Sequence, residues 1–508
     1  MTSRLGIGAA LCVTRLVAVV VLVTSVVSPA AAQSPLPRFE RADCLVDGAW
    51  ARGIQRECGW LLVPESRDSA SARTVRLAVE IFRARDPNGA PPRVLLHGGP
   101  GGPGGIRQYS EGVARSLLFL HHDVVIYDQR GAGLSEPAIC PAYDSVAEGA
   151  QNLRSEAARE RALSGARHAC MAELKTQGIN RLDYSTAASV ADLIDLRRAL
   201  GYESWDIYGV SYGARLAQEA MARDGHAIRA VVLASPVARN FSSQAEQPLS
   251  TQHALERVFA ACARQPSCRD AFPHVEQDYY AVYDDLLTSP VPVPVVRPSG
   301  GRDTVWLDGT RLVDEIRNRL VDEPRVGVSR LPLLIHELRA GDRERAAREF
   351  VGTGATPPRL VGRALRELIN CADRATAGAA YRKTLDSVNA VARSPFRRAR
   401  DQECDDWLGS SQEGAMPVPV HSDIPTLILV GHFDDRTPAT QARRIASTLS
   451  RASLVEFPDE GHDTRPGRCH AGIVMEFLED PTRQVDISCI AAIPPITFAT
   501  TWEPAEQR

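Results

Sequence analysis

Hydrophobic and polar positions follow two different periods along this chain. Residues 75–82 alternate apolar and polar side chains, as a half-buried strand does, and residues 59–64 predict a strand just before them. Short apolar runs predict further strands that are buried on both faces, at residues 93–96, 124–127, 205–208 and 230–234. Residues 187–200 instead carry apolar side chains at helical spacing and end before Gly201. Strands that alternate with helices predict an α/β fold with a mostly parallel central sheet.

The pattern changes to a run of helices between about residues 240 and 415. The clearest predicted helices are residues 252–264, 275–287, 311–320 and 359–375. A Pro-rich run at 289–294 interrupts them and predicts an extended connector. Strand-like runs return at 426–430 and 453–457. We therefore predict one α/β core, formed by residues 33–239 and 416–508, with a mainly helical insertion at 240–415.

The first 32 residues have the pattern of a secretory signal peptide. Arg4 and Arg15 supply positive charge, residues 16–27 are apolar, and Ala30 to Ala32 form an A-x-A cleavage pattern. An uncleaved anchor helix is the alternative. The apolar stretch 16–27 is short for that role, because a membrane span needs about 20 apolar residues. We therefore predict cleavage near Ala32, a secreted or periplasmic protein, and no stable membrane insertion after cleavage.

Composition and cysteine content narrow the protein class. The 508 residues carry a net charge of −3, so the chain has no excess of positive charge that would indicate binding to nucleic acid. Ten of the 11 cysteines lie beyond the signal segment, and an even number in an exported chain predicts disulfides. Pairing each cysteine with its neighbour in the chain is the simplest arrangement, and buried free thiols are the alternative. No CxxC or HExxH pattern occurs, so no metal is predicted. The sequence makes no prediction of oligomeric state.

Ser211 lies in the pentapeptide Gly209-Val210-Ser211-Tyr212-Gly213, between a strand-like run and the helix-like run 214–221. A serine between two glycines at a strand-to-helix turn is the pattern of a nucleophile elbow, which pushes the hydroxyl out above the sheet. A serine hydroxyl needs a base to take its proton, and that base needs an orienting acid. Ser211 is therefore the candidate nucleophile.

The acid and the base are expected in strand-end loops downstream, in the order serine, acid, histidine. Asp434 follows the strand-like run 426–430 in a Gly-x-x-Asp spacing, and its neighbour Asp435 is the alternative. His462 follows the run 453–457 and a glycine, so it is the candidate base. The oxyanion of an acyl-transfer intermediate needs N–H donors. We expect these from Tyr212 and from the loop after residues 93–96, where Gly99 is favoured over Gly98. No Gly-Lys-Ser/Thr follows this loop, which argues against a phosphate loop, and no cofactor is predicted.

Five segments together resemble the α/β-hydrolase serine peptidases of the proline iminopeptidase and tripeptidyl aminopeptidase group. They are His97-Gly98-Gly99-Pro100-Gly101, residues 128–135 (DQRGAGLS), residues 209–213, residues 431–438 and Gly461-His462. The exported, cysteine-rich chain resembles the tripeptidyl aminopeptidase-like branch. The resemblance implies an α/β-hydrolase fold with a helical cap insertion, and release of residues or short peptides from free N-termini. It also implies cap acids that bind the substrate ammonium, for which Glu367 and Asp373 are candidates.

We therefore expect an exported serine hydrolase that acts as an aminopeptidase through Ser211, Asp434 and His462. A carboxylesterase that cleaves small acyl esters with the same residues is the alternative, because one scaffold serves many substrates. The predicted partner is a peptide or small ester substrate. An inactive binding protein is the non-enzyme alternative, and the presence of every required residue argues against it.

Overall fold

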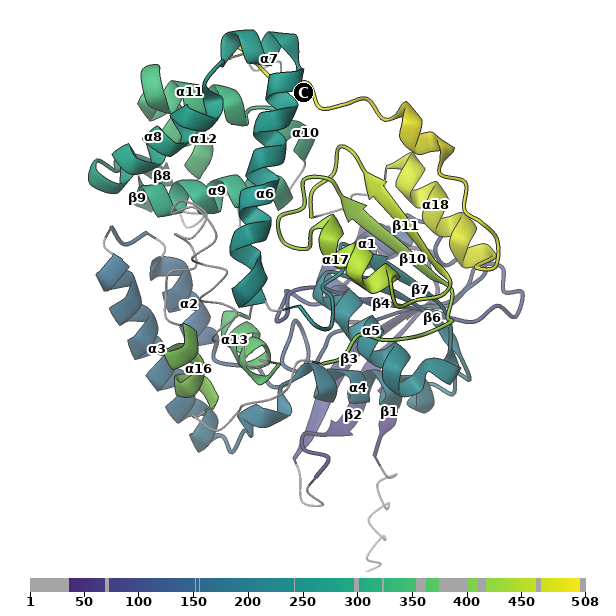
Figure 1. Ribbon diagram of the computed structural model, residues 1–508. Helices are drawn as coiled ribbons and strands as arrows, with labels where there is room; N and C mark the ends of the chain where they lie inside the picture. The colour runs from purple at the N-terminus through teal and green to yellow at the C-terminus, as the bar shows by residue number, and fades with distance from the viewer. Residues whose placement is uncertain are drawn as a thin grey trace, which may run out of the picture. The chain divides into compact units, whose positions relative to one another are not determined.

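A nine-stranded sheet forms the centre of the protein in the computed structural model (Figure 1). The structure describes residues 36–68, 73–150, 152–154, 156–241, 243–296, 301–321, 324–352, 362–373, 400–408, 417–462 and 467–502. In sheet order the strands are β1 (Arg38–Arg41), β2 (Arg56–Pro64), β3 (Thr74–Phe82), β5 (Val124–Tyr127), β4 (Arg93–Leu96), β6 (Trp205–Val210), β7 (Ile228–Ala234), β10 (Thr426–Gly431) and β11 (Ala452–Phe457). The six strands from β5 to β11 in this order are parallel, and β1 to β3 pair antiparallel. The predicted mostly parallel sheet is confirmed.

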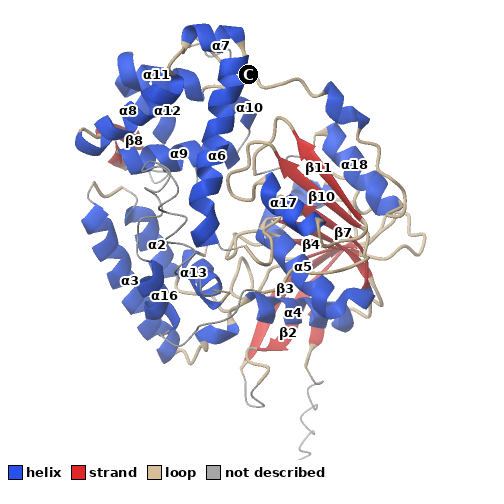
Figure 2. Ribbon diagram, in the orientation of Figure 1, coloured by secondary structure: helices blue, strands red, loops and turns tan. Residues whose placement is uncertain are grey.

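Successive strand residues belong to hydrophobic cores on opposite faces of the sheet. Figure 2 shows the strands of this sheet with helices packed around them. In β10, Ile428 and Val430 point into one core while Leu427 and Leu429 point into another. The first face is covered by α4 (Thr186–Ala199), α5 (Tyr212–Asp224) and α17 (Ala439–Ala446). The other face is covered by α1 (Gly105–Ala114) and α18 (Arg468–Glu479). Burial on both faces explains why these strands are continuous apolar runs in the sequence.

The segment between β7 and β10 is mainly helical and has a hydrophobic core of its own. Its described helices are α6 (Ser243–Arg264), α7 (Pro266–Ala271), α8 (Val275–Thr288), α9 (Gly309–Val321), α10 (Pro324–Gly327), α11 (Leu331–Ala340), α12 (Arg343–Val351), α13 (Arg363–Ala372) and α16 (Arg400–Leu408). The four predicted helices correspond to α6, α8, α9 and α13, although positions 359–361 and 374–375 of the last lie outside the described residues.

The Pro-rich run, predicted as an extended connector, forms a strand of a small sheet. Residues Val291–Val296 form β8, which pairs antiparallel with β9 (Arg302–Leu307) in a separate two-stranded sheet. Val291, Val293 and Val295 are buried, whereas Pro292 and Pro294 are exposed. The prolines fit because β8 is an edge strand, where a missing N–H need not break a ladder. The partner strand has the sequence RDTVWL, with three polar residues followed by three apolar ones, so it shows no strand-like alternation that would have predicted the pairing.

Two helices that the sequence did not predict join the helices of the insertion. They are α2 (Pro141–Ala150) and α3 (Glu156–Thr176), from the N-terminal part of the chain. The rings of Tyr143 on α2 and Trp407 on α16 lie 5.2 Å apart, and Asp144 accepts a hydrogen bond of 3.0 Å from the N–H of Ala364 on α13. Helices from both sides of residue 240 therefore pack together. The predicted domain boundaries stay predictions, because residues Leu36–Arg508 group as one compact unit.

All ten cysteines beyond the first 32 residues form disulfides, each with its neighbour in the chain. The pairs are Cys44–Cys58, Cys140–Cys170, Cys262–Cys268, Cys371–Cys404 and Cys469–Cys489. This confirms the predicted pairing. The predicted signal segment, residues 1–32, lies outside the described residues. Within the described chain, no helix combines the length and the apolar character that a membrane crossing needs.

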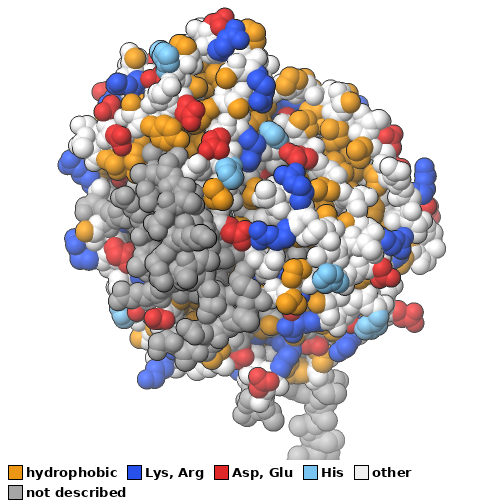
Figure 3. All heavy atoms as spheres, in the orientation of Figure 1, with side chains coloured by type: hydrophobic (Ala, Val, Ile, Leu, Met, Phe, Trp, Pro, Cys, Tyr) orange, Lys and Arg blue, Asp and Glu red, His pale blue; other side chains and the backbone are white. Residues whose placement is uncertain are grey.

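Charged side chains of both signs are mixed on the face of the molecule shown in Figure 3. Among the coloured, described residues of that face, lysine and arginine side chains are interspersed with acidic and apolar ones and form no continuous basic area. This distribution agrees with the net charge of −3.

Candidate active site

Ser211 occupies a sharp turn between β6 and α5, with a backbone φ of 55° and ψ of −116°. A Cβ atom on Gly209 would lie 2.6 Å from the carbonyl oxygen of Gly213, and one on Gly213 would lie 2.1 Å from that of Leu96. Both contacts are closer than real Cβ atoms allow. Glycine is therefore required on each side of Ser211 so that strand and helix can approach this closely.

The unusual conformation of Ser211 is held by backbone hydrogen bonds. Its N–H donates to the carbonyl of Ala234 (2.9 Å), and its carbonyl accepts from the N–H groups of Ala214 (3.1 Å) and Val237 (3.3 Å). A non-glycine residue at positive φ costs on the order of 1–3 kcal/mol and persists only where the surroundings impose it. Here β7 and the turn after it impose it, which keeps the hydroxyl fixed.

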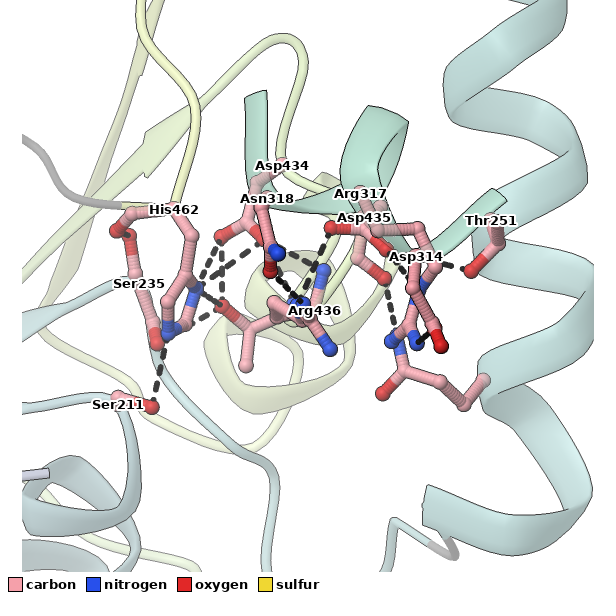
Figure 4. Close-up of polar contacts among 12 residues, drawn as sticks. Ser211, Ser235, Thr251, Asp314, Arg317, Asn318, Asp434, Asp435, Arg436 and His462 are labelled. Atoms are coloured by element: carbon pink, nitrogen blue, oxygen red, sulfur yellow. Dashed lines mark hydrogen bonds and ion pairs between the residues drawn. The ribbon is translucent and has the colours of Figure 1, made fainter. Parts of the chain in front are cut away.

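The structure brings Ser211, His462 and Asp434 into one hydrogen-bonded chain (Figure 4). Nε2 of His462 lies 3.0 Å from Oγ of Ser211, and Nδ1 lies 3.1 Å from Oδ2 of Asp434. Asp434 lies in the loop after β10 and His462 in the loop after β11. These are adjacent parallel strands, so their ends deliver both side chains to the same edge of the sheet.

The carboxylate of Asp434 is fully buried and accepts several hydrogen bonds. The N–H groups of Arg436 and Thr437 each donate to Oδ1 at 2.8 Å, and the hydroxyl of Thr437 donates to Oδ2 at 2.6 Å. Burial alone would raise the pKa of Asp434, but the positive charge of His462 and the hydrogen bonds from His462 and Thr437 outweigh it. The pKa therefore lies below its ordinary value, and the group is held as a carboxylate.

Asp435, the alternative acid, points away from His462. Its Oδ2 accepts from Nε of Arg317 at 2.9 Å and from the hydroxyl of Thr251 at 3.2 Å. Both partners belong to the insertion helices, α9 and α6. Of the two neighbouring carboxylates, only Asp434 is within hydrogen-bonding distance of the imidazole.

The loop of His462 is tied to the end of β7. Its carbonyl accepts a hydrogen bond of 2.6 Å from the hydroxyl of Ser235, and the carbonyl of Ser235 accepts one of 2.9 Å from Thr437. Ser235 adopts a φ of 45°, a second strained position beside the site. The imidazole side chain is 13% exposed, so the base is shielded but not sealed from solvent. Sequence patterns gave no sign of Ser235, because an isolated serine after a strand is common.

The glycine-rich loop 97–105 lies directly beside Ser211. A Cβ atom on Gly98 would be 3.0 Å from Cβ of Ser211, a tight contact that the glycine avoids. Gly99 is the next residue, with a φ of 133°, and Tyr212 begins α5 at its N-terminus. Among the described backbone groups, the N–H of neither Gly99 nor Tyr212 donates to a protein carbonyl. The oxyanion role of the Gly99 and Tyr212 N–H groups stays a prediction.

Asp128 holds the glycine-rich loop in place, a role that the sequence did not assign. Its carboxylate accepts from the N–H of Ile106 (3.0 Å) and of Leu134 (2.7 Å). A Cβ atom on Gly104 or on Gly133 would lie within 2.4 Å of Asp128 Oδ2, so both glycines make room for this carboxylate. The signal was present in residues 128–135, where an aspartate after a buried strand precedes two glycines.

Comparison with known proteins matches two parts of the chain that carry these residues. Residues 91–271, which hold the glycine-rich loop and Ser211, match the family described as alpha/beta hydrolase fold. Residues 389–489, which hold Asp434 and His462, match a family described as TAP-like protein. The chain has the α/β-hydrolase fold. It is similar to the tripeptidyl aminopeptidase-like group within that fold.

The relatives of this α/β-hydrolase are distant. A tripeptidyl aminopeptidase of Streptomyces coelicolor (strain ATCC BAA-471 / A3(2) / M145) is 29% identical over 204 residues, which are 37% of this chain and 36% of that protein. A putative hydrolase, YuaR, of Escherichia coli (strain K12) is 26% identical over 42% of this chain and 43% of that protein. The chain thus matches less than half the length of either relative. A solved α/β hydrolase enzyme, MGS-M2 from a Medee basin deep-sea metagenome library, aligns with a TM-score of 0.37 and 14% identity, over 82% of this chain and 97% of that one.

In this α/β-hydrolase, helix α13 of the insertion contacts the glycine-rich loop. A Cβ atom on Gly101 would lie 2.3 Å from the carbonyl oxygen of Gly362, and Nε of Arg366 lies 3.4 Å from the carbonyl oxygen of Pro100. The two predicted cap acids, Glu367 and Asp373, lie on and just after this helix.

The two acids have different surroundings. Asp373 accepts a hydrogen bond of 3.1 Å from the N–H of Thr186 and also bonds its hydroxyl, which in turn lies 2.8 Å from the hydroxyl of Tyr212. Its carboxylate therefore anchors the N-terminus of α4. Glu367 is half-buried and lies earlier in α13.

The described residues offer one cluster of three groups that could ligate a metal. It consists of Cys44, Cys58 and Glu80. The two cysteines form a disulfide, so their sulfurs cannot bind an ion as thiolates. The chemistry that the arrangement around Ser211 can perform is nucleophilic attack by an activated hydroxyl.

Proposed function

We propose that this protein is an exported serine aminopeptidase that releases residues or short peptides from free N-termini. The observation that carries the proposal is the hydrogen-bonded chain Ser211–His462–Asp434 at a strained strand-to-helix turn. Its geometry matches what an acyl-transfer enzyme needs, namely a nucleophile, a base within reach and an acid that orients the base.

The reaction proceeds through a covalent acyl-enzyme. Oγ of Ser211 attacks the scissile carbonyl carbon while Nε2 of His462 takes the hydroxyl proton. The N–H groups of Gly99 and Tyr212 stabilise the resulting oxyanion. His462 then gives the proton to the leaving amine, and the C–N bond breaks. Water, deprotonated by His462, attacks the acyl-enzyme and releases the acid product and Ser211.

Asp434 keeps Nδ1 of the imidazole protonated and directed toward the carboxylate. That tautomer leaves Nε2 free to accept the proton of Ser211. The lowered pKa of Asp434 supports this role, because the acid stays ionised and stabilises the imidazolium that forms during attack.

Preference for a free N-terminus is proposed from the cap and from the relatives. The relative from Streptomyces coelicolor is named a tripeptidyl aminopeptidase. An ammonium at the end of a bound peptide needs an acidic partner, because an unpaired buried charge is costly. We assign this role to Glu367, since the carboxylate of Asp373 already accepts hydrogen bonds from Thr186.

Export is proposed from the signal-like pattern of residues 1–32 and from the five disulfides. Disulfides persist in oxidising compartments such as a periplasm or the extracellular medium and are rare in a reducing cytosol.

A substrate panel tests the proposal. Purified wild-type protein and Ser211→Ala are compared on aminoacyl- and tripeptidyl-arylamides, on the same compounds with an acetylated N-terminus, and on short p-nitrophenyl esters. We expect turnover of the free arylamides, strongly reduced turnover of the acetylated ones, and none with Ser211→Ala. Turnover of esters alone would instead support the alternative, a carboxylesterase with the same nucleophile. Equal activity of wild-type protein and Ser211→Ala would contradict both.

A further inference from the structure

Helix α9 of the insertion contacts the two loops that carry the acid and the base. From its central turns, Arg317 donates through Nε to Oδ2 of Asp435 at 2.9 Å. From its last turn, the carbonyl of Leu320 accepts a hydrogen bond of 3.3 Å from the N–H of His462. One helix thus touches the residue next to Asp434 and the backbone of His462 itself.

Helix α6 holds the same acid loop from a second direction. The hydroxyl of Thr251 donates to Oδ2 of Asp435 at 3.2 Å, and the side-chain amide of Gln247 donates to the carbonyl of Asp435. Further along the same helix, Arg257 donates to the carbonyl of Asp434 at 3.4 Å. The backbone carbonyls of Asp434 and Asp435 therefore both accept hydrogen bonds from the insertion.

The residue before Asp434 is also fixed by the insertion. The phenyl ring of Phe433 is buried in the hydrophobic core that the insertion helices form, not in the cores of the central sheet. Figure 4 shows the resulting division, with His462 and Ser211 on one side of the acid loop and Arg317 and Thr251 on the other.

The pair of Arg317 and Asp435 has little access to water. Asp435 is fully buried, and the side chain of Arg317 is 8% exposed. Without Arg317, the buried carboxylate of Asp435 keeps the hydroxyl of Thr251 and the more distant guanidinium of Arg436, whose Nε lies 3.5 Å from Oδ1. A buried carboxylate that loses its nearer cation is expected to turn toward the remaining one. Because Asp435 is bonded directly to Asp434 in the chain, such a movement would carry the acid away from His462.

We propose that Arg317 is a positioning residue, whose ion pair with Asp435 fixes the acid loop so that Asp434 meets His462. The proposal rests on the proposed function for its kinetic consequence. The insertion then acts as a brace for the acid and the base as well as a cover. Displacing a reacting group by about 1 Å can lower turnover by about 10²-fold.

The test compares Arg317→Met with a matched variant at the other end of α9. Arg159 on α3 forms an ion pair of 3.0 Å with Asp308, the residue before α9, and both side chains are 15% exposed. Arg159→Met therefore removes an arginine–aspartate pair at the start of α9, whereas Arg317→Met removes one nearer its end. Arg317→Lys keeps the charge and serves where Arg317→Met fails to fold, as judged by its melting temperature.

Two readouts separate positioning from general stability. The first is the split between kcat and KM on a substrate that the wild-type enzyme turns over. The second is the low-field proton resonance of the imidazole N–H shared by His462 and Asp434, assigned by its loss in Asp434→Asn. The resonance requires no substrate, so it tests the brace even if the peptidase assignment is wrong. If the wild-type protein showed no turnover that depends on Ser211, the proposed function would be overturned, but the resonance would still test the position of Asp434.

We expect Arg317→Met to lower kcat by about 10²-fold with KM nearly unchanged, and to shift or lose the low-field resonance. Arg317→Lys should fall between Arg317→Met and the wild type, while Arg159→Met keeps both kcat and the resonance. An unchanged resonance in Arg317→Met or Arg317→Lys, or equal losses of kcat in Arg317→Met and Arg159→Met, would overturn the proposal.

Discussion

Asp434 and Asp435 are neighbours in the chain, yet their carboxylates bind partners on opposite sides of one loop. Oδ2 of Asp434 lies 3.1 Å from Nδ1 of His462, whereas Oδ2 of Asp435 lies 2.9 Å from Nε of Arg317. Two adjacent acids of the same charge thus have distinct roles, which can be separated by substitution.

Asp434→Asn should lower kcat by about 10⁴-fold, because an amide holds the imidazole in the wrong tautomer. Asp435→Asn should lower kcat by about 10²-fold at most, because it weakens the hold on the loop without changing the group that faces His462. Steady-state kinetics of both variants on one substrate measure the difference. Equal losses would mean that the two carboxylates share one role.

Gly213→Ala tests the tight approach of β6, α5 and β4. Its Cβ atom would lie 2.1 Å from the carbonyl oxygen of Leu96, so the backbone must move and activity should be lost with it. Overpacking of this kind costs about 1–3 kcal/mol. The control is Gly112→Ala on α1, where an added Cβ atom would have no neighbour within 4 Å. This variant should stabilise the protein by about 0.5–1 kcal/mol, because alanine favours a helix more than glycine does. Urea unfolding and kcat/KM give both numbers, and similar effects of the two variants would contradict the close-approach argument.

The pH dependence of activity follows from the lowered pKa of Asp434. A carboxyl whose folded pKa is depressed contributes its stability in full above its unfolded pKa, about 3.9, and loses it as the pH falls through the folded value. Asp434 is thus ionised throughout the working range and adds no proton to the acid limb of kcat/KM. We expect a one-proton limb between about pH 5 and 8. A limb that requires two protons would contradict this assignment.

The same linkage predicts how stability responds to acid. The difference in free energy of unfolding between wild-type protein and Asp434→Asn should be constant above about pH 5 and shrink below about pH 4. Urea titrations at several pH values measure it. A difference that grows on acidification would have the wrong sign for a depressed carboxyl.

Glu367→Gln should lower kcat/KM for peptides with a free N-terminus by about 10- to 10²-fold, because a hydrogen bond between charged groups is worth about 1.5–3 kcal/mol. Short esters carry no ammonium, so their turnover should be unaffected. Asp373→Asn, at the end of the same helix, should reduce both activities alike through the N-terminus of α4. If Asp373→Asn lowered peptide turnover and Glu367→Gln did not, the substrate ammonium would be assigned to Asp373 instead.

The sequence predicted those parts of the protein whose physics is local. Strands buried on both faces are continuous apolar runs, and the elbow around Ser211 needs glycines at fixed positions. The ten cysteines pair between neighbours along the chain, and that arrangement could be proposed from order alone.

What the sequence could not give depends on contacts between distant segments. The pairing of β8 with β9 and the packing of α2 against α16 need the tertiary structure to bring the partners together. The roles of Asp128 and Asp435 are also of this kind, since each carboxylate binds groups far from it in the chain or on another element. A single aspartate in a polar loop carries no periodic signal.

The central claim is that Ser211 is the nucleophile, and covalent labelling tests it most directly. Wild-type protein and Ser211→Ala are treated with a fluorophosphonate, and the adducts are located by mass spectrometry of peptides. The account predicts one adduct on the peptide that contains Ser211, formed much more slowly in Asp434→Asn, and none in Ser211→Ala. An unlabelled wild-type protein, or equal labelling of wild-type protein and Ser211→Ala, would contradict it.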